Sequence, residues 1–355
     1  MRGIVFTGEK AEVTSALEVR APGPSEVLVR IAAAGVCHSD ISVIDGTIPW
    51  PAPAVLGHEG AGIVEEVGTE VTHVKPGDHA VVTTLANCGM CGPCNTGHPT
   101  WCRKSLGNMS QPFTLDGAPA WNFAAASVFA ERTVVKAIQV VPIDRRVPLE
   151  SAALIGCGVV TGVGAVFNRA RVQHGESAAV FGVGGIGLNV IQALRLSDAG
   201  RIVAVDTVPA KEPLAREFGA TDFVDARDTD VPNAIRELTG GGVTWSFECV
   251  GHPAVVRTAV DALDWGGMCV IIGVPRAEAM LEVPITFLTH VDRGVMGCRY
   301  GSVRPHHDIP MLVDLYLAGR LKLDELVSQT YPLEAFDSAV ADMHDGKLAR
   351  GVLTF

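Results

Sequence analysis

The sequence is poor in aromatic residues and lacks an excess of positive charge. Aromatic residues make up 6% of the 355 residues, and the formal net charge is −11. An acidic surface repels the phosphates of nucleic acids and of anionic lipids, so we expect neither as a partner. The hydrophobic fraction of 48% is ample for globular folding, and a chain of this length predicts two domains.

Long hydrophobic runs are also scarce. The opening stretch "MRGIVFTGEKAEVT" has no apolar segment typical of a signal peptide. The most apolar long segment, 178–194, is crowded with glycines and interrupted by Asn189 and Gln192, which makes it a poor membrane span. We therefore expect a cytoplasmic protein without a membrane partner.

The cysteines do not form an even set. There are nine, so complete pairing within one chain is impossible, and a reducing compartment favours thiols or metal ligands over disulfides. Internal repeats, low-complexity tracts and charge runs are absent from the sequence. Glycine, by contrast, is frequent, with 39 residues and no collagen periodicity, which indicates tight turns and close backbone approaches.

Residues 1–155 combine short β-type runs with many glycines and prolines. Examples of such runs are "EVLVRIAAAGV" (26–36), "GAGIVEEVG" (60–68) and "DHAVVTT" (78–84), and turn signals such as "KPGD" separate them. This pattern predicts a mainly β domain with many loops.

From about residue 160 the pattern changes to strands that alternate with helices. Six apolar, β-branched strands are predicted at 177–183, 201–206, 221–225, 245–251, 268–274 and 293–298. Such alternation predicts a doubly wound parallel sheet in an α/β protein. The tail is too short to bury a core of its own, so the predicted domains are 1–158 with 297–355, and 159–296.

A glycine-rich stretch, "FGVGGIGLNV", follows one predicted strand and opens a predicted helix. In this G-x-G-G-x-G pattern the first glycine allows a tight turn, another lets the backbone reach a pyrophosphate, and the last lets the helix pack on the strand. The helix N-terminus attracts the phosphate charge. We therefore predict a dinucleotide site at Gly182, Gly184, Gly185 and Gly187.

The strand after this motif ends in Asp206, where a carboxylate can bind the adenosine ribose hydroxyls. Its charge would face the 2′-phosphate of NADP, and the next residue is Thr207 rather than an arginine. NAD is therefore the predicted cofactor. The alternative is a glycine-rich turn beside an unrelated aspartate.

Four cysteines stand close together in "NCGMCGPCNTGHPTWC". The spacing C-x2-C-x2-C-x7-C can close a tetrahedral zinc site, which leaves no position for a substrate and is therefore structural. A redox pair would leave two cysteines unexplained, and an iron–sulfur cluster is a further alternative. A nucleic-acid zinc ribbon is disfavoured by the low positive charge that follows. The predicted ligands are Cys88, Cys91, Cys94 and Cys102.

Five stretches, in their order and at their intervals, closely resemble the zinc-dependent medium-chain alcohol dehydrogenases. They are "GVCHSD", "GHEGAGIVEEVG", "CGMCGPC", "GCGVVTGVGAVFN" and "VFGVGGIGLNV", and the likeness continues to "GKLARGVLTF". In that family a GroES-like catalytic domain carries the zinc ions and a Rossmann domain binds NAD(H). The resemblance thus implies this fold and an NAD-dependent zinc alcohol dehydrogenase with two zinc ions per chain.

Cys37, His58 and Cys157 are too dispersed for their spacing alone to connect them. The resemblance implies that they hold a catalytic zinc, because two thiolates, one imidazole and a water make an open site. It also implies that Asp40 orients His58 from behind and that Glu59 lies near the metal.

The resemblance assigns Ser39 to a hydrogen bond with the alcohol hydroxyl, as the start of a proton relay. Many members carry a histidine at the outer end of this relay, where the present chain has Ser42. Cofactor ribose and water, or His38 acting as a base, are the alternatives there.

Further residues are implied at the cofactor and the substrate. His38 and Arg350 match positions that contact the pyrophosphate, Thr161 a position beside the nicotinamide, and Lys211 a position near the adenosine ribose. Ile186, within the glycine motif, and Val274 are also implied to bind the cofactor. The substrate channel is implied at Thr84, Trp101 and Met296.

The channel positions predict the size of the substrate. Many members have an aromatic residue where this chain has Thr84, so the channel has more room here, and Trp101 supplies a flat apolar wall. This combination predicts an aromatic or long-chain primary alcohol, because ethanol has few methylene groups to bury.

Other functions and assemblies are alternatives. A formaldehyde dehydrogenase acting on a thiol adduct would keep charges in the channel, whereas "DGTIPWPAPAVLGHE" is apolar after Asp45. A zinc-free reductase or a cofactor-binding regulator on the same fold would not need the dispersed zinc ligands. The expected assembly is a homodimer, with a tetramer as the alternative.

Overall fold

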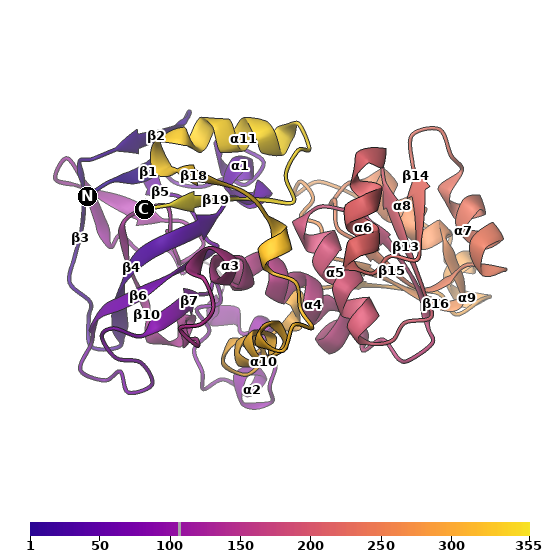
Figure 1. The fold of residues 1–355 in the computed structure, drawn as a ribbon, viewed down its shortest axis with the longest axis horizontal. Coiled ribbons are helices and arrows are strands. Elements are labelled where there is room, and N and C mark those ends of the chain that lie inside the picture. The colour runs from indigo at the N-terminus through magenta and orange to yellow at the C-terminus, as the bar shows by residue number, and fades with distance from the viewer. Residues whose placement is uncertain (106–107) are drawn as a thin grey trace. The chain divides into compact units, whose positions relative to one another are not determined.

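The computed structural model describes residues 1–105 and 108–355, which divide into two units. The first unit is discontinuous and comprises Met1–Gly158 and Arg304–Phe355, and the second is Val159–Val303. In Figure 1 the first unit contains both the indigo N-terminal strands and the yellow C-terminal ones. The sequence places the return to the first domain at 297, whereas in the structure the chain stays with the second unit up to Val303.

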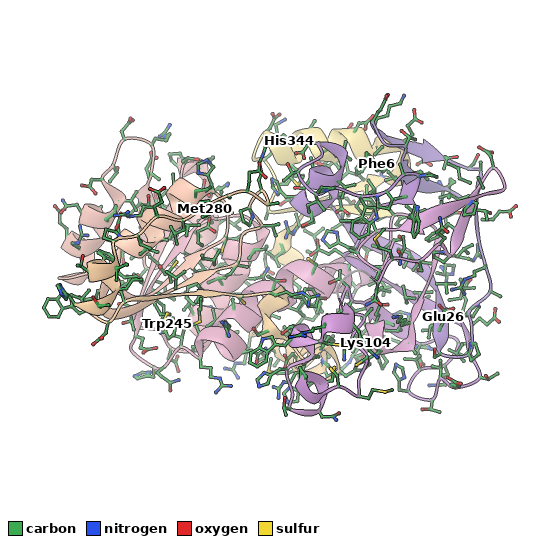
Figure 2. The ribbon with its side chains drawn as sticks, turned by 180° about the vertical axis from the view of Figure 1, so that it is seen from behind. Phe6, Glu26, Lys104, Trp245, Met280 and His344 are labelled. Atoms are coloured by element: carbon green, nitrogen blue, oxygen red, sulfur yellow. The ribbon has the colours of Figure 1, made fainter. Side chains whose placement is uncertain are left out.

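The first unit is mainly β. Alternate residues of its longest strand, among them Val27, Val29 and Ile31, are buried in one hydrophobic core, as expected for a strand with one face on the core. Phe6 belongs to the same core (Figure 2). The strands of this unit are β1 (Gly3–Phe6), β2 (Ala11–Thr14), β3 (Leu17–Val19), β4 (Glu26–Gly35), β5 (Ala54–Val55), β6 (Gly60–Val67), β7 (His79–Val82), β8 (Phe113–Leu115), β9 (Ala118–Asn122), β10 (Arg132–Lys136), β11 (Val140–Pro142), β18 (Val327–Pro332) and β19 (Arg350–Thr354).

These strands form two sheets. One has the order β2-β1-β5-β9-β8-β3, and the other has the order β11-β7-β6-β4-β19-β18, with β10 also paired to β4. The C-terminal β19 runs antiparallel to β4, with Val352 opposite Gly35. The tail is therefore part of the same sheet as the N-terminal strands. The helices of this unit are α1 (His38–Ile44), α2 (Gly92–Asn95), α3 (Leu149–Leu154), α10 (Pro305–Leu317) and α11 (Phe336–His344).

The second unit is the predicted doubly wound α/β domain, and all six predicted strands are confirmed. They are β12 (Ser177–Phe181), β13 (Arg201–Asp206), β14 (Asp222–Asp225), β15 (Val243–Glu248), β16 (Leu263–Ile271) and β17 (Gly294–Gly297). All adjacent pairs are parallel, in the order β14-β13-β12-β15-β16-β17. The order reverses between β12 and β15, which is where such sheets bind nucleotides. The helices are α4 (Val160–Gly164), α5 (Gly185–Leu196), α6 (Glu212–Phe218), α7 (Val231–Thr239), α8 (Pro253–Asp261) and α9 (Ile285–Thr289).

One helical stretch, Leu149–Ala170, is long and apolar enough to cross a membrane, but 83% of its most apolar window is buried inside the protein. A stretch buried to this extent is a core helix. It contains two π-helical segments, Ile155–Val159 and Ala165–Ala170, on either side of the α-helical Val160–Gly164. Such segments are frequent at functional sites, and the first of them carries Cys157.

Candidate metal centres and active site

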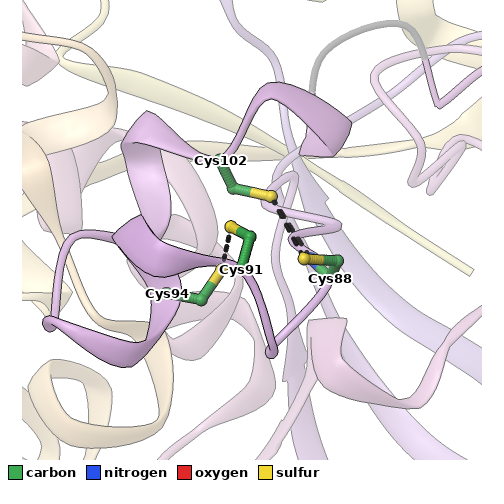
Figure 3. A group of neighbouring side chains, drawn as sticks. All are labelled: Cys88, Cys91, Cys94 and Cys102. Carbon is green, nitrogen blue, oxygen red and sulfur yellow. Dashed lines mark hydrogen bonds between the residues drawn. The ribbon is translucent and has the colours of Figure 1, made fainter.

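The four clustered cysteines point their sulfur atoms toward one another (Figure 3). All four Sγ atoms lie within 4.8 Å of one another. The Sγ atoms of Cys91 and Cys94 are 3.5 Å apart, and those of Cys88 and Cys102 are 3.7 Å apart. A tetrahedral ion with Zn–S bonds of about 2.3 Å has S–S edges of about 3.8 Å, whereas a disulfide would require about 2.0 Å. All nine cysteines are free thiols, and this set fits zinc.

Local structure favours the thiolate form of Cys88 and Cys94, whereas, against the opposing effect of the Cys94 backbone N–H, burial and the neighbouring sulfur atoms raise the pKa of Cys91 to about 12. The backbone N–H of Met90 stabilises the thiolate of Cys88 and lowers its pKa to about 6. The backbone N–H of Cys88 in turn donates to Cys102 Sγ at 3.5 Å, and the Asn87 amide donates to Cys94 Sγ at 3.5 Å. These hydrogen bonds stabilise negative charge on the sulfur atoms, and a metal ion binds the same sulfur atoms as thiolates.

A second group assembles from three distant places in the chain. Cys37 directly precedes α1, His58 lies between β5 and β6, and Cys157 lies in the π-helical turn Ile155–Val159. One ligand atom of each lies within 4.8 Å of the others. Two thiolates and one imidazole leave a fourth tetrahedral position free for a substrate, which is the pattern of a catalytic zinc site.

Asp40 sets the orientation of this group from a fully buried position. Its Oδ1 accepts hydrogen bonds from His58 Nδ1 at 3.0 Å and from the backbone N–H of Gly57 at 3.1 Å, while Oδ2 accepts from the backbone N–H of Cys37 at 3.2 Å. Nδ1 is thereby the donor, which leaves Nε2 of His58 for a metal. Burial opposes a charged imidazole, but the facing charges of Asp40 and Cys37 raise the pKa of His58 well above its usual value.

Glu59 and Arg350 lie beside the metal ligands as a buried ion pair. Glu59 Oε2 is 3.6 Å from Arg350 Nε, and Glu59 Oε1 accepts a hydrogen bond from the backbone N–H of Gly158 at 2.8 Å. Burial raises the pKa of Glu59 to about 7, although the charge of Arg350 acts in the opposite direction. The pair is possible because a β-carbon at Gly35 would lie 2.5 Å from Glu59 Oε2, and one at Gly158 would lie 2.7 Å from Arg350 Nη2. Gly35 and Gly158 are not among the predicted site residues. The only signal for these two glycines in the sequence is that they lie close to the ligands Cys37 and Cys157.

Two aromatic residues outside the predicted set also lie at this centre. The ring of Phe123 packs edge-on against the imidazole of His58, with centroids 5.6 Å apart and an interplanar angle of 87°. Trp50 packs edge-on against Phe123 at 5.1 Å and donates its Nε1 hydrogen to the backbone oxygen of Asn122 at 2.9 Å. Trp50 stands in the apolar entrance stretch, whereas Phe123 carries no local signal that would connect it to His58.

The remaining predicted residues of the first unit have these positions. Ser39 and Ser42 are partly buried on α1, and His38 is exposed at its start. Thr84 follows β7 and is partly exposed. Trp101 is 53% exposed and stacks on His98 with ring centroids 4.1 Å apart. Their roles toward proton, cofactor and substrate stay predictions.

In the glycine motif of the second unit, the glycines serve the different structural purposes that the sequence predicts. Gly182 has a φ of +92° at the turn after β12. A β-carbon at Gly187 would lie 1.9 Å from the Gly182 oxygen, so only glycine permits this helix–strand contact. Around Gly184, which caps α5, a β-carbon would meet nothing within 4 Å. That open cradle at a helix N-terminus fits a phosphate group.

Asp206 lies at the end of β13, beside this motif. Its Oδ2 accepts hydrogen bonds from the backbone N–H of Val183 at 2.7 Å and from Lys211 Nζ at 3.0 Å, and its Oδ1 accepts from the backbone N–H of Val208 at 3.0 Å. An adjacent pocket of about 430 Å³ is lined by Asp206, Gly182, Asp230, three threonines and several apolar side chains. Its place and lining fit an adenosine. Thr161, Ile186, Val274 and Met296 also belong to this unit, and their contacts with cofactor or substrate stay predictions.

Comparisons with known proteins agree with this geometry. The family model of the alcohol dehydrogenase GroES-like domain matches residues 23–145, and that of zinc-binding dehydrogenases matches residues 185–318. An S-(hydroxymethyl)glutathione dehydrogenase of Photobacterium damsela subsp. piscicida is 41% identical over 352 residues, which covers 96% of this chain and 95% of that protein. One from Escherichia coli O9:H4 (strain HS) is 38% identical and covers 98% of this chain and 97% of its own length.

Solved structures are similar over the full chain. An alcohol dehydrogenase zinc-binding domain protein from Burkholderia ambifaria superimposes with a TM-score of 0.94 at 37% identity, covering 100% of this chain and 98% of that one. Benzyl alcohol dehydrogenase from Acinetobacter calcoaceticus has the same TM-score at 33% identity, covering 100% and 99%.

Proposed function

The chain belongs to the zinc-binding medium-chain alcohol dehydrogenase family, and on that premise we propose that it oxidises a primary hydroxyl group with NAD, reversibly. The observation that carries the proposal is the convergence of Cys37, His58 and Cys157 with one coordination position left open. The closed site of four cysteines is a structural zinc site of the same enzyme.

The chain's own residues prepare this chemistry. Cys37, His58 and Cys157 would hold a zinc ion that would polarise the substrate oxygen and lower the pKa of its hydroxyl, and a bound NAD would supply the hydride acceptor. Asp40 keeps the imidazole of His58 in the tautomer that presents Nε2. Ser39 Oγ, on the first turn of α1, receives the hydroxyl proton and passes it outward.

The relay can be tested on the two serines of α1. Ser39→Ala should lower kcat by about 10²-fold or more with cofactor binding intact, because the proton then loses its first acceptor. Ser42→Ala should have little effect if water already completes the path. Equal damage from both variants would make Ser42 a relay member and refute this assignment.

The first substrate class to test is the hydroxymethyl adduct of a thiol, which is the class that the names of the curated relatives support. They support it better than the aromatic or long-chain alcohol that the sequence favours. An aromatic primary alcohol is the second candidate, because Phe123 packs against His58, Trp50 packs against Phe123, and the entrance stretch after Asp45 is apolar. A benzyl alcohol dehydrogenase is among the similar structures.

One substrate panel separates these candidates. Purified enzyme with NAD should be assayed for kcat/KM on formaldehyde with glutathione, formaldehyde alone, benzyl alcohol, octanol and ethanol. Oxidation of formaldehyde that requires glutathione supports the adduct, and a higher value for benzyl alcohol supports the second candidate. Ethanol as the best substrate would contradict both, and inactivity on all of them would refute the proposed reaction.

We also expect a preference for NAD over NADP of at least roughly 100-fold in kcat/KM, because a phosphate facing the Asp206 carboxylate costs a few kcal/mol. Asp206→Ala should reduce the difference in kcat/KM between NAD and NADP, chiefly because it weakens the binding of NAD. An enzyme that already prefers NADP would refute the ribose assignment. A homodimer in the cytoplasm stays our expectation for the assembly, with a tetramer as the alternative.

A further inference from the structure

The loop that carries Phe123 has an unusual backbone. Ala124, Ala125 and Ser127 adopt left-handed conformations with φ of 50°, 58° and 51°. A β-carbon disfavours this region, so non-glycine residues persist there only where their surroundings over-determine the conformation. Strain of this kind clusters at functional sites, which directs attention to what the loop holds in place.

The Ser127 hydroxyl ties the loop to a neighbouring strand. Ser127 is fully buried, its Oγ donates to the backbone oxygen of Val55 at 2.8 Å, and it accepts from the backbone N–H of Phe123 at 2.8 Å. Val55 ends β5, directly before the segment that carries His58. The Phe123 backbone is therefore connected to the strand that leads to a zinc ligand in two ways, through this hydroxyl and through its own N–H, which also donates to the Val55 oxygen at the longer distance of 3.2 Å.

Two more buried side chains hold the loop from outside. Thr133 Oγ1 on β10 donates to the backbone oxygen of Ala126 at 2.6 Å. Gln139 Nε2 donates to the backbone oxygen of Ala125 at 3.0 Å and to that of Thr83 at 2.8 Å. Hydrogen bonds at Phe123, Ala125 and Ala126 thus restrain the strained backbone, and the ring of Phe123 is left with one position against His58 and Trp50.

We propose that Ser127 is a positioning residue for substrate selection, which locks Phe123 beside the catalytic metal and thereby sets the preference between aromatic and small primary alcohols. The proposal rests on the proposed oxidation of primary alcohols and adds to it the element that selects among them. Ser127 acts through Phe123, whose ring offers an edge or a face to an aromatic substrate.

The first test replaces the hydroxyl. Ser127→Ala should lower the ratio of kcat/KM for benzyl alcohol to that for ethanol about tenfold, the size of one aromatic contact, mainly through a higher KM for benzyl alcohol. The matched control is Ser151→Ala, which removes another buried hydroxyl whose hydrogen bond goes to Asp324 Oδ1 at 2.6 Å. It should lower the melting temperature similarly and leave the ratio unchanged. Zinc content should equal that of the wild type in both variants.

A second variant separates positioning from stability. Ala125→Gly relieves the left-handed strain and keeps the backbone oxygen that Gln139 binds, so the melting temperature should stay equal or rise. The selectivity ratio should then stay close to that of the wild type, because the hydrogen bonds at Phe123, Ala125 and Ala126 remain. The proposal is overturned if the ratio of zinc-loaded Ser127→Ala stays within twofold of wild type, or if the ratio falls equally in Ala125→Gly or in the Ser151→Ala control. A wild-type enzyme inactive on every primary alcohol would refute the proposed reaction itself.

Discussion

At the scale of single residues, burial changes the pKa of ionisable side chains. Glu248, at the end of β15, is fully buried. Its Oε1 accepts hydrogen bonds from the backbone N–H groups of Val250 at 2.9 Å and Gly251 at 2.8 Å, and its Oε2 has no hydrogen-bond partner among the described residues. Burial raises the pKa of this carboxyl group above its usual value of 4.5, although the backbone donors act in the opposite direction.

This raised pKa predicts how stability changes with pH. The folded chain holds the proton of Glu248 more tightly than the unfolded chain, so its protonation favours folding, and that contribution is lost as the pH rises from about 4.5 through the folded pKa. Glu248→Gln cannot titrate. Its melting temperature relative to wild type should therefore increase between pH 4.5 and pH 8. A melting-temperature difference that does not change with pH would contradict the raised pKa.

At the scale of elements, the two zinc sites differ in what surrounds them. The helix α2 inside the four-cysteine segment has four residues and none of them is buried, so little hydrophobic burial supports it. The ligands Cys37, His58 and Cys157 instead stand on or beside β4, β6 and a buried helical stretch. A metal ion in the four-cysteine site thus stabilises the segment around it, whereas the surrounding fold already positions Cys37, His58 and Cys157.

Matched cysteine variants test this difference. Cys102→Ser should cost folding and solubility, because it opens the site that holds its segment together. Cys157→Ser should give a folded, NAD-binding but inactive protein. Each variant should contain one zinc per chain against two in the wild type, measured by elemental analysis beside the melting curve. If the two variants behaved alike, the division between structural and catalytic zinc would be wrong.

At the scale of the whole molecule, the chain ends inside the unit in which it begins. β19 extends the sheet at β4, and its first residue, Arg350, pairs with Glu59 next to the catalytic ligands. The second unit, Val159–Val303, is continuous in sequence and has its own hydrophobic core.

Truncation before Arg350 should therefore act on one unit only. Hydrogen exchange should become faster in β4, which loses its neighbouring strand β19, and in β6, which follows Glu59 and its lost ion pair. It should stay slow in β12 and β13 of the second unit. Mass spectrometry of peptides from both units measures this. Equal loss of protection in both units would show that they fold as one cooperative body.

Several features of this protein were determined by the sequence alone. The six strands of the second unit are confirmed because β-branched runs and the helices between them are local signals. The glycine motif and the four-cysteine cluster were equally readable, because all their members lie within one short segment and their spacing itself sets the geometry.

Only the tertiary structure decided how distant residues meet at the catalytic centre. The family resemblance named Cys37, His58 and Cys157, but the room that Gly35 and Gly158 leave for Glu59 depends on strand register and on a π-helical turn. The contact of Phe123 with His58 depends on a strained loop fastened to β5 through Ser127. Such contacts join residues far apart in the chain, and no local propensity or spacing encodes them, because they exist only once the sheets have paired.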